Sequence, residues 1–367
     1  MRSALLCTLV LAGWAASGEA GGAARAQQTE RTGAELYDAA CAACHGSDGR
    51  GAPQSVVGFD VPLPDFTDCS FSTVEPDPDW QAIVHQGGPV RGFDRLMPAY
   101  GEALTADEIA RVVDRTREFC LEPNWPRGDL NLPRPFFTEK AFPENEAVLT
   151  TGVSDGAVTN DFVYEHRVGR RGQYEIVVPL DFVEGESGGW SRGLGDLAVA
   201  YKHAVYDDLR RGSILSVGAE VIFPTGKEAV GLGHGFNVFE MFGTLSQVLP
   251  GDGFMHLHGG FELPIRAAQA SNEVFWRLAA GRTFAEDEGR GRAWSPMVEL
   301  LAARELSEGE TVHWDVLPEV QVSLNTRQHI LFNVGVRVPL NEREGRSSAF
   351  LMYLLWDWFD GGLLAGW

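Results

Sequence analysis

The sequence predicts a small all-α domain followed by an antiparallel transmembrane β-barrel of about twelve strands. In the N-terminal part, apolar residues recur at helical spacing around a C-x-x-C-H motif. Beyond it, apolar and polar residues alternate in segments of about 9–12 residues, the length with which tilted barrel strands cross a bilayer. A proline-rich stretch separates the two patterns. The boundaries fall at residues 1–26, 27–122, 123–144 and 145–367.

Residues 1–26 have the features of a secretory signal. Arg2 precedes the apolar run A-L-L-C-T-L-V-L-A-G-W-A-A, and A-R-A at residues 24–26 forms a cleavage site. Cys7 lies inside the apolar run and away from the cleavage site, which argues against a lipoprotein anchor. The sequence therefore predicts export to a compartment where c-type haem is attached and disulfides persist.

The C-x-x-C-H motif follows a predicted helix directly. Cys41 and Cys44 are spaced to form thioethers with one haem, and His45 is placed to ligate its iron. A zinc or redox site is the alternative that this motif leaves open. We therefore expect one covalently attached haem c, with Cys41 and Cys44 as its attachment points.

The second axial ligand is expected from Met97, in D-R-L-M-P-A-Y-G, with His85 as the competing residue. Met97 precedes a predicted helix that begins at Thr105, where Glu108 completes a capping box. Ligation by His and Met fills both axial positions, which suits electron transfer and leaves no open site at the iron.

Two further cysteines lie in the same domain. Cys69 and Cys120 are candidates for a disulfide, because an oxidising compartment favours joining them. Two unpaired buried thiols are the alternative, since the sequence does not give their separation. The order of helix, C-x-x-C-H, loop, methionine and closing helix resembles a class I monohaem cytochrome c over nearly all of residues 27–122.

Residues 123–144 contain five prolines and are expected to form a semi-extended connector. In the alternating segments that follow, one face is apolar and the other polar, as in Y-E-I-V-V-P-L-D-F and H-I-L-F-N-V-G-V-R-V-P-L. The alternation predicts a lumen-facing set of polar side chains. That set is Glu165, Arg167, Glu175, Asp181, Glu220, His256, His258, Glu262, Arg277, Glu319 and Arg337.

Clean alternation also occurs in soluble β-sandwiches and barrels, so this class stays open. Strand length and aromatic residues near segment ends favour the outer-membrane barrel. These aromatics are Trp190, Tyr206, Trp276, Trp294, Trp314, Trp356 and Trp358, with a terminal Trp367. In the lumen set, His256, His258 and Glu262 could bind a metal such as iron, the alternative being a hydrated, salt-bridged lumen.

The segments G-L-G-D-L-A-V-A-Y-K-H-A-V and L-S-V-G-A-E-V-I-F-P-T-G resemble the outer-membrane barrel family named for transport in the phenol-degradation meta pathway. The strands G-G-F-E-L-P-I and G-V-R-V-P-L are similar to it too. The fused layout is also similar to cytochrome–porin proteins that oxidise extracellular iron. That resemblance extends to the architecture alone. With Met97 filling the second axial position, we expect a carrier rather than an enzyme or, if catalysis occurs, an Fe(II)-oxidising oxidoreductase.

Three functions follow as expectations. The first is electron transfer between periplasmic carrier proteins and a solute or metal reaching the barrel lumen, with the haem domain held by the connector at the periplasmic mouth. The second is an outer-membrane channel for small or aromatic compounds with an auxiliary haem. The third is an exported haem enzyme with a soluble β-domain. The net charge of −21 excludes general affinity for nucleic acid, which needs clustered Lys and Arg.

Overall fold

The computed structural model describes residues 30–58, 60–122, 124–185, 188–265, 270–286, 291–324, 328–342 and 346–357. The predicted signal segment and the aromatic residues Trp358 and Trp367 lie outside the described residues. Within those ranges, no helix combines the length and the apolar character needed to cross a membrane.

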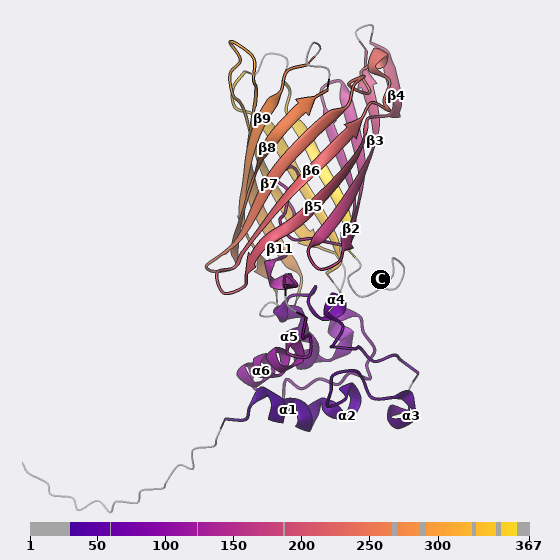
Figure 1. Ribbon diagram of the computed structural model, residues 1–367, viewed down its shortest axis with the longest axis vertical. Helices are drawn as coiled ribbons and strands as arrows, with labels where there is room; N and C mark the ends of the chain where they lie inside the picture. The colour runs from indigo at the N-terminus through magenta and orange to yellow at the C-terminus, as the bar shows by residue number, and fades with distance from the viewer. Residues whose placement is uncertain are drawn as a thin grey trace, which may run out of the picture. The chain divides into compact units, whose positions relative to one another are not determined.

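The N-terminal part is helical (Figure 1). α6 begins at the capping box predicted from Thr105 and Glu108, and α1 begins at a second one formed by Thr32 and Glu35. α1 and α6 share an apolar core that includes Leu36, Tyr37, Ile109, Val112 and Val113. The helices are α1 (Gly33–Ala40), α2 (Ala42–His45), α3 (Gln54–Val57), α4 (Cys69–Ser72), α5 (Asp77–Gln86) and α6 (Ala106–Arg117), with 3-10 turns η1 (Gly88–Arg91), η2 (Gly128–Leu130) and η3 (Glu228–Val230).

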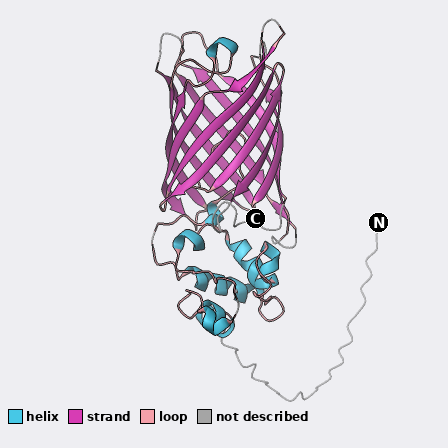
Figure 2. Ribbon diagram, turned by 90° about the vertical axis from the view of Figure 1, so that its right-hand side faces the viewer, coloured by secondary structure: helices cyan, strands magenta, loops and turns pink. Residues whose placement is uncertain are grey.

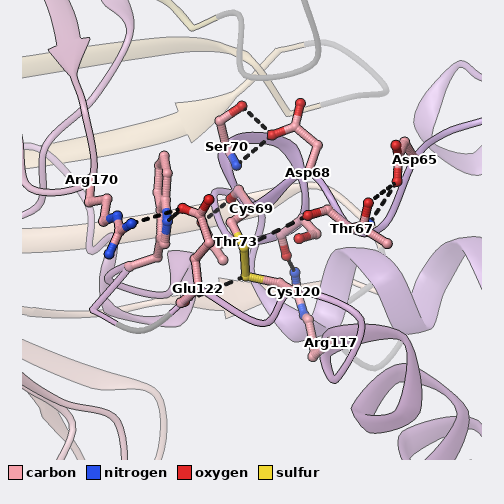
Figure 3. Close-up of a disulfide and its surroundings, with 12 residues drawn as sticks. Asp65, Thr67, Asp68, Cys69, Ser70, Thr73, Arg117, Cys120, Glu122 and Arg170 are labelled. Atoms are coloured by element: carbon pink, nitrogen blue, oxygen red, sulfur yellow. Dashed lines mark hydrogen bonds and ion pairs between the residues drawn. A yellow bond between two sulfur atoms is a disulfide. The ribbon is translucent and has the colours of Figure 1, made fainter. Parts of the chain in front are cut away.

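A disulfide joins Cys69, the first residue of α4, to Cys120 after α6, as the sequence analysis expected (Figure 3). The two Cα atoms are 5.1 Å apart, within the range that a disulfide can span. Close to this bond, Arg170 forms an ion pair with Glu122 at 3.4 Å. The cross-link therefore fixes the C-terminal end of the helical domain to α4.

The second part is a closed antiparallel barrel of twelve strands (Figure 2). β14 pairs with β1, and β9 pairs with β11, so the ring has no free edge. Two short strands, β4 and β10, extend neighbouring hairpins. The strands are β1 (Glu146–Ser154), β2 (Ala157–Val168), β3 (Gly172–Glu184), β4 (Trp190–Leu194), β5 (Leu197–Asp208), β6 (Ser213–Phe223), β7 (Val238–Leu249), β8 (Gly253–Pro264), β9 (Glu273–Arg282), β10 (Phe284–Ala285), β11 (Ala293–Glu305), β12 (His313–Ser323), β13 (Ile330–Pro339) and β14 (Ala349–Asp357).

The outer face of the barrel is apolar on strands all around the ring. These side chains are exposed although they are large and apolar, which suits contact with lipid and not with water. Examples are Phe162, Leu180, Val199, Val217, Phe261, Val298 and Phe350. A soluble β-domain would not leave such a belt uncovered, so the third expected function loses its structural basis.

The two ends of the barrel differ in their connections. At the end where the chain enters β1, three hairpins close with short turns at residues 169–171, 209–212 and 250–252. Most connections at the opposite end are longer, for example residues 224–237 between β6 and β7. We call these the short-turn end and the long-loop end. Outer-membrane barrels carry short turns on the periplasmic side and long loops outside.

Candidate functional site

A cavity of about 930 Å³ lies in the helical domain and is lined by Cys41, Cys44, His45 and Met97. Cys41 and Cys44 are free thiols at the start and inside of α2, and His45 ends that helix. The rest of the wall is largely apolar, with Phe66, Phe71, Trp80, Ile83 and Leu96 among its residues. The four residues predicted to hold a haem are thus brought to one cavity of a size typical for cofactors.

Two buried polar atoms of the wall support the fit of a haem. His45 stacks on Phe66 with 4.9 Å between ring centroids, and burial lowers its pKa. The imidazole is therefore neutral at neutral pH, the form that ligates a metal. Neither His45 Nδ1 nor Trp80 Nε1 has a hydrogen-bond partner among the described residues. A haem in the cavity would offer a propionate carboxylate to the Trp80 donor, while His45 is the residue that would ligate its iron.

The positions of Met97 and His85 separate the two candidates for the second axial ligand. Met97 lines the cavity, and its backbone oxygen accepts a hydrogen bond from Gly88 at 3.1 Å. His85 is not among the lining residues, and its ring packs against Gly101, where an added Cβ would lie 2.7 Å from the ring. The arrangement favours Met97 as the ligand.

The zinc alternative for C-x-x-C-H finds no support in the described part of the chain. A structural zinc site gathers its ligand atoms around one ion. The one group of three or more such side chains with ligand atoms within 4.8 Å of one another is Glu144, Glu146 and Glu165, far from the motif in sequence. Those carboxylates are neutralised by Lys140 and Arg134, as described below.

One corner of the cavity is charged. Arg91 in η1 is buried and forms an ion pair with Asp79 of α5 at 2.6 Å. Beside it, Glu75 accepts from Nε2 of His329 at 3.0 Å. His329 precedes β13, and its Nδ1 lies 3.4 Å from the Asp357 carboxylate of β14. A residue of the barrel thus lines the same cavity as Cys41 and Met97.

A second cavity of about 240 Å³ adjoins this corner. It shares Glu75, Asp79 and His329 with the first cavity. Its other wall includes Asp357 and Lys140 at the short-turn end of the barrel. The Glu75–His329 pair therefore separates the haem cavity from a polar chamber at the floor of the lumen.

Residues 131–145 occupy the lumen at the short-turn end, and we call them the plug. Glu299 on β11 accepts hydrogen bonds from the backbone N–H groups of Phe136, Phe137 and Thr138 at 2.7–3.3 Å and from the Thr138 hydroxyl at 2.5 Å. Arg277 on β9 donates to the Phe137 carbonyl at 2.9 Å. The hydroxyls of Ser216, Thr244 and Ser246 form hydrogen bonds with the plug backbone at Glu139 and Ala141.

Ion pairs hold the charged residues of the plug. Arg134 pairs with Glu146 and Glu165 of the first two strands. Lys140 pairs with Glu144 at 2.5 Å, and Lys202 on β5 pairs with Glu139 at 2.5 Å. Phe142 and Ala141 are fully buried among the strands.

This finding corrects the expectation for residues 123–144. Its described residues form no α-helix, as its prolines predict, but the stretch includes the 3-10 turn η2 and does not serve as a connector held only at its ends. Its alternating charges and aromatic side chains complement the lumen wall, so it folds into the barrel.

The structure does not bring His256, His258 and Glu262 together as a metal site. His256 bonds Ser246 at 2.8 Å and the Pro133 carbonyl at 3.0 Å. His258 accepts from the backbone N–H of Glu139 at 3.3 Å. Both histidines therefore bind the plug, and among the described residues they join no group of metal-ligating side chains.

The predicted lumen set does share one face of the barrel. Cross-strand pairing aligns Glu165 with Glu175 and His258 with Arg277, and the buried members include Glu165, Arg167, His256, His258 and Glu319.

The same pairing aligns Glu220 with Glu240, Glu240 with Glu262, and Glu262 with Glu273. These four carboxylates, the glutamate row, lie on neighbouring strands β6 to β9, and Arg277 of β9 also faces the lumen.

Several residues of the site lie outside any sequence motif and were not predicted. Arg91 and His329 stand in no motif, and His329 reaches the cavity only because β13 and β14 begin and end there. The plug contact at Glu299 depends on closure of the barrel, which pairs strands far apart in sequence. A run of alternating charges in a proline-rich stretch was the one available sign that residues 123–144 have a folded environment.

Both parts of the chain have similarities among known proteins. Residues 28–114 match the family model of the cbb3-type cytochrome c oxidase subunit III. The COG4313 outer membrane channel from Pseudomonas putida F1 is similar at 11% identity and TM-score 0.45, covering 62% of this chain and 100% of that one. The KdgM porin is similar at 10% identity and TM-score 0.40, covering 58% and 99%. No curated protein matches. A domain similar to cytochrome c is thus followed in one chain by a closed twelve-strand barrel.

Proposed function

We propose that the protein transfers electrons through one covalently attached haem c, between periplasmic carrier proteins and a positively charged solute or metal ion that enters the barrel from outside the cell. Cys41 and Cys44 would hold the haem, and His45 and Met97 would ligate its iron. The observation that carries the proposal is the single cavity lined by these four residues. With both axial positions filled, such a haem supplies one-electron transfer rather than substrate chemistry at the iron.

The plug favours this role over the alternative of a channel for small or aromatic compounds. Residues 131–145 cross the lumen and bind side chains of most strands, so a solute cannot pass without displacing them. A twelve-strand lumen is also narrower than the aqueous pore of a sixteen-strand porin. A blocked lumen is compatible with a solute that delivers an electron and leaves by the same end.

The orientation in the outer membrane rests on the barrel itself. Its apolar outer belt fits lipid, and its short-turn end is the end from which the haem domain extends in the chain. By the usual polarity of such barrels, the haem domain lies in the periplasm and the long loops lie outside. There the domain could reach periplasmic electron carriers.

The glutamate row supports a cationic rather than an anionic solute. Like charges directly opposite each other on neighbouring strands cost free energy unless something compensates them. Arg277 offsets part of this charge, but four carboxylates face one guanidinium. A lumen wall of this charge concentrates cations and repels anions.

Haem loading and redox chemistry test the proposal. The chain is produced with a c-type haem maturation system, and its mass and visible spectrum are measured after denaturation. We expect one haem that stays bound in denaturant, a low-spin spectrum and a reversible one-electron titration. A haem lost on denaturation, or a high-spin iron that binds external ligands readily, would contradict the assignment of Cys41, Cys44 and Met97.

A further inference from the structure

The charged corner of the haem cavity contains cationic side chains that have no role in the proposed function. Among the described lining residues, only Arg91 and His329 can carry a positive charge apart from His45, which faces the iron position. A haem has two propionate carboxylates, and the remaining wall is mostly apolar. The propionates therefore have this corner as their favourable surroundings.

His329 is held between two acids. Glu75 accepts from its Nε2 at 3.0 Å, and Asp357 lies 3.4 Å from its Nδ1. Its side chain is 8% exposed, and those of Glu75 and Asp357 are 15% and 10% exposed. Two carboxylates at this distance in a partly buried place favour the doubly protonated imidazolium. Asp79 also acts on this corner, while Lys140 and Glu144 act on Asp357.

We propose that His329, a residue of the barrel, completes the haem site: its imidazole would lie beside the haem propionates and, when the haem accepts one electron, binds one proton and becomes an imidazolium. The electron comes from a redox mediator or the physiological donor, and the proton comes from solvent onto Nδ1. The proton on Nε2 stays in the shorter bond to Glu75. The positive charge gained at His329 balances the charge lost at the iron.

The polar chamber provides a route for this proton. It adjoins His329 on the side of the lumen floor and has a volume of about 240 Å³, enough for several water molecules. Asp79 shares the wall, and burial together with neighbouring Glu75 raises its pKa to about 6, with Arg91 opposing the shift. Asp79 is thus the second group that could bind a proton here, and the test must separate the two.

This inference rests on the proposed electron-transfer role, and the two fail in different ways. The haem spectrum of the full chain is titrated with redox mediators at several pH values. If no haem titrates, the proposed function fails. If the haem titrates but its potential is independent of pH, only the present inference fails. For the full chain we expect a potential that falls as pH rises, by up to a tenfold change in the redox equilibrium per pH unit, which is about 59 mV for one electron.

His329→Gln should remove this slope and give, at low pH, the potential that the unchanged chain reaches only at high pH. His203→Gln, on β5 away from the cavity, should keep the slope. Should His329→Gln fail to fold, Glu75→Gln provides the second test, because loss of this acid weakens proton binding at His329 and moves the slope to lower pH. A slope that survives in His329→Gln and disappears in Asp79→Asn would overturn the proposal in favour of Asp79.

Discussion

Glu299→Gln tests whether the plug is held in the lumen as the structure places it. The carboxylate accepts hydrogen bonds from three backbone N–H groups and one hydroxyl of Phe136, Phe137 and Thr138. A glutamine amide has one acceptor oxygen, and its NH₂ group would face N–H donors. At least two hydrogen bonds to a charged group are lost, each worth about 1.5 kcal/mol or more. The variant should therefore reduce the free energy that holds the plug in the lumen by about 3 kcal/mol.

Two measurements follow this change. In planar bilayers the unchanged chain should conduct little, and Glu299→Gln should show transient openings because the plug leaves the lumen more often. Thermal unfolding, followed by the heat-dependent gel mobility of the barrel, should shift to lower temperature. Glu308→Gln, in the exposed loop that follows the same strand, is the matched control and should change neither property. A high conductance of the unchanged chain would refute the description of residues 131–145 as a plug, and an equally low conductance in all three proteins would refute the role of Glu299 in holding it.

Three further changes test other parts of the account. Met97→Ala should convert the low-spin spectrum to one with an open axial position and lower the potential, whereas Met255→Ala on the outer face of β8 should do neither; an unchanged spectrum in Met97→Ala would exclude this ligand. Cys69→Ala with Cys120→Ala opens a cross-link between residues 51 apart and should cost the helical domain about 4 kcal/mol, so equal denaturant midpoints with and without the disulfide would contradict its role. Glu240→Gln with Glu262→Gln should slow haem reduction by cationic reductants and speed it for anionic ones, without moving the equilibrium potential; equal rates for both charges of reductant would show that solutes do not meet the glutamate row.

The sequence predicted those parts of the fold that local pattern determines. The capping box at Thr105 and Glu108 marked the start of α6 at the correct residue. Strict alternation assigned lumen and lipid faces correctly, because a strand places successive side chains on opposite faces whatever its neighbours are. The spacing of the C-x-x-C-H motif likewise predicted a shared site for Cys41, Cys44 and His45, and the three residues line one cavity.

What the sequence did not predict depends on contacts between distant segments. The plug is held by side chains of β11, β9 and β5, which surround residues 131–145 only after the barrel has closed. No local pattern in the sequence predicts these contacts. For the same reason His256 and His258 were candidates for metal binding, although the structure uses both to hold the plug. His329 lines the haem cavity because β13 and β14 meet at the floor of the barrel, an arrangement that follows from strand pairing and not from a local motif.

Reduction of the haem across an intact membrane tests the central claim most directly. The chain is inserted into liposomes with the haem domain inside, and a membrane-impermeant cationic reductant such as Fe(II) is added outside while the haem spectrum is recorded. The account predicts that the haem becomes reduced in sealed vesicles and that Glu240→Gln with Glu262→Gln slows this reduction. Reduction that occurs only after the vesicles are lysed would contradict it.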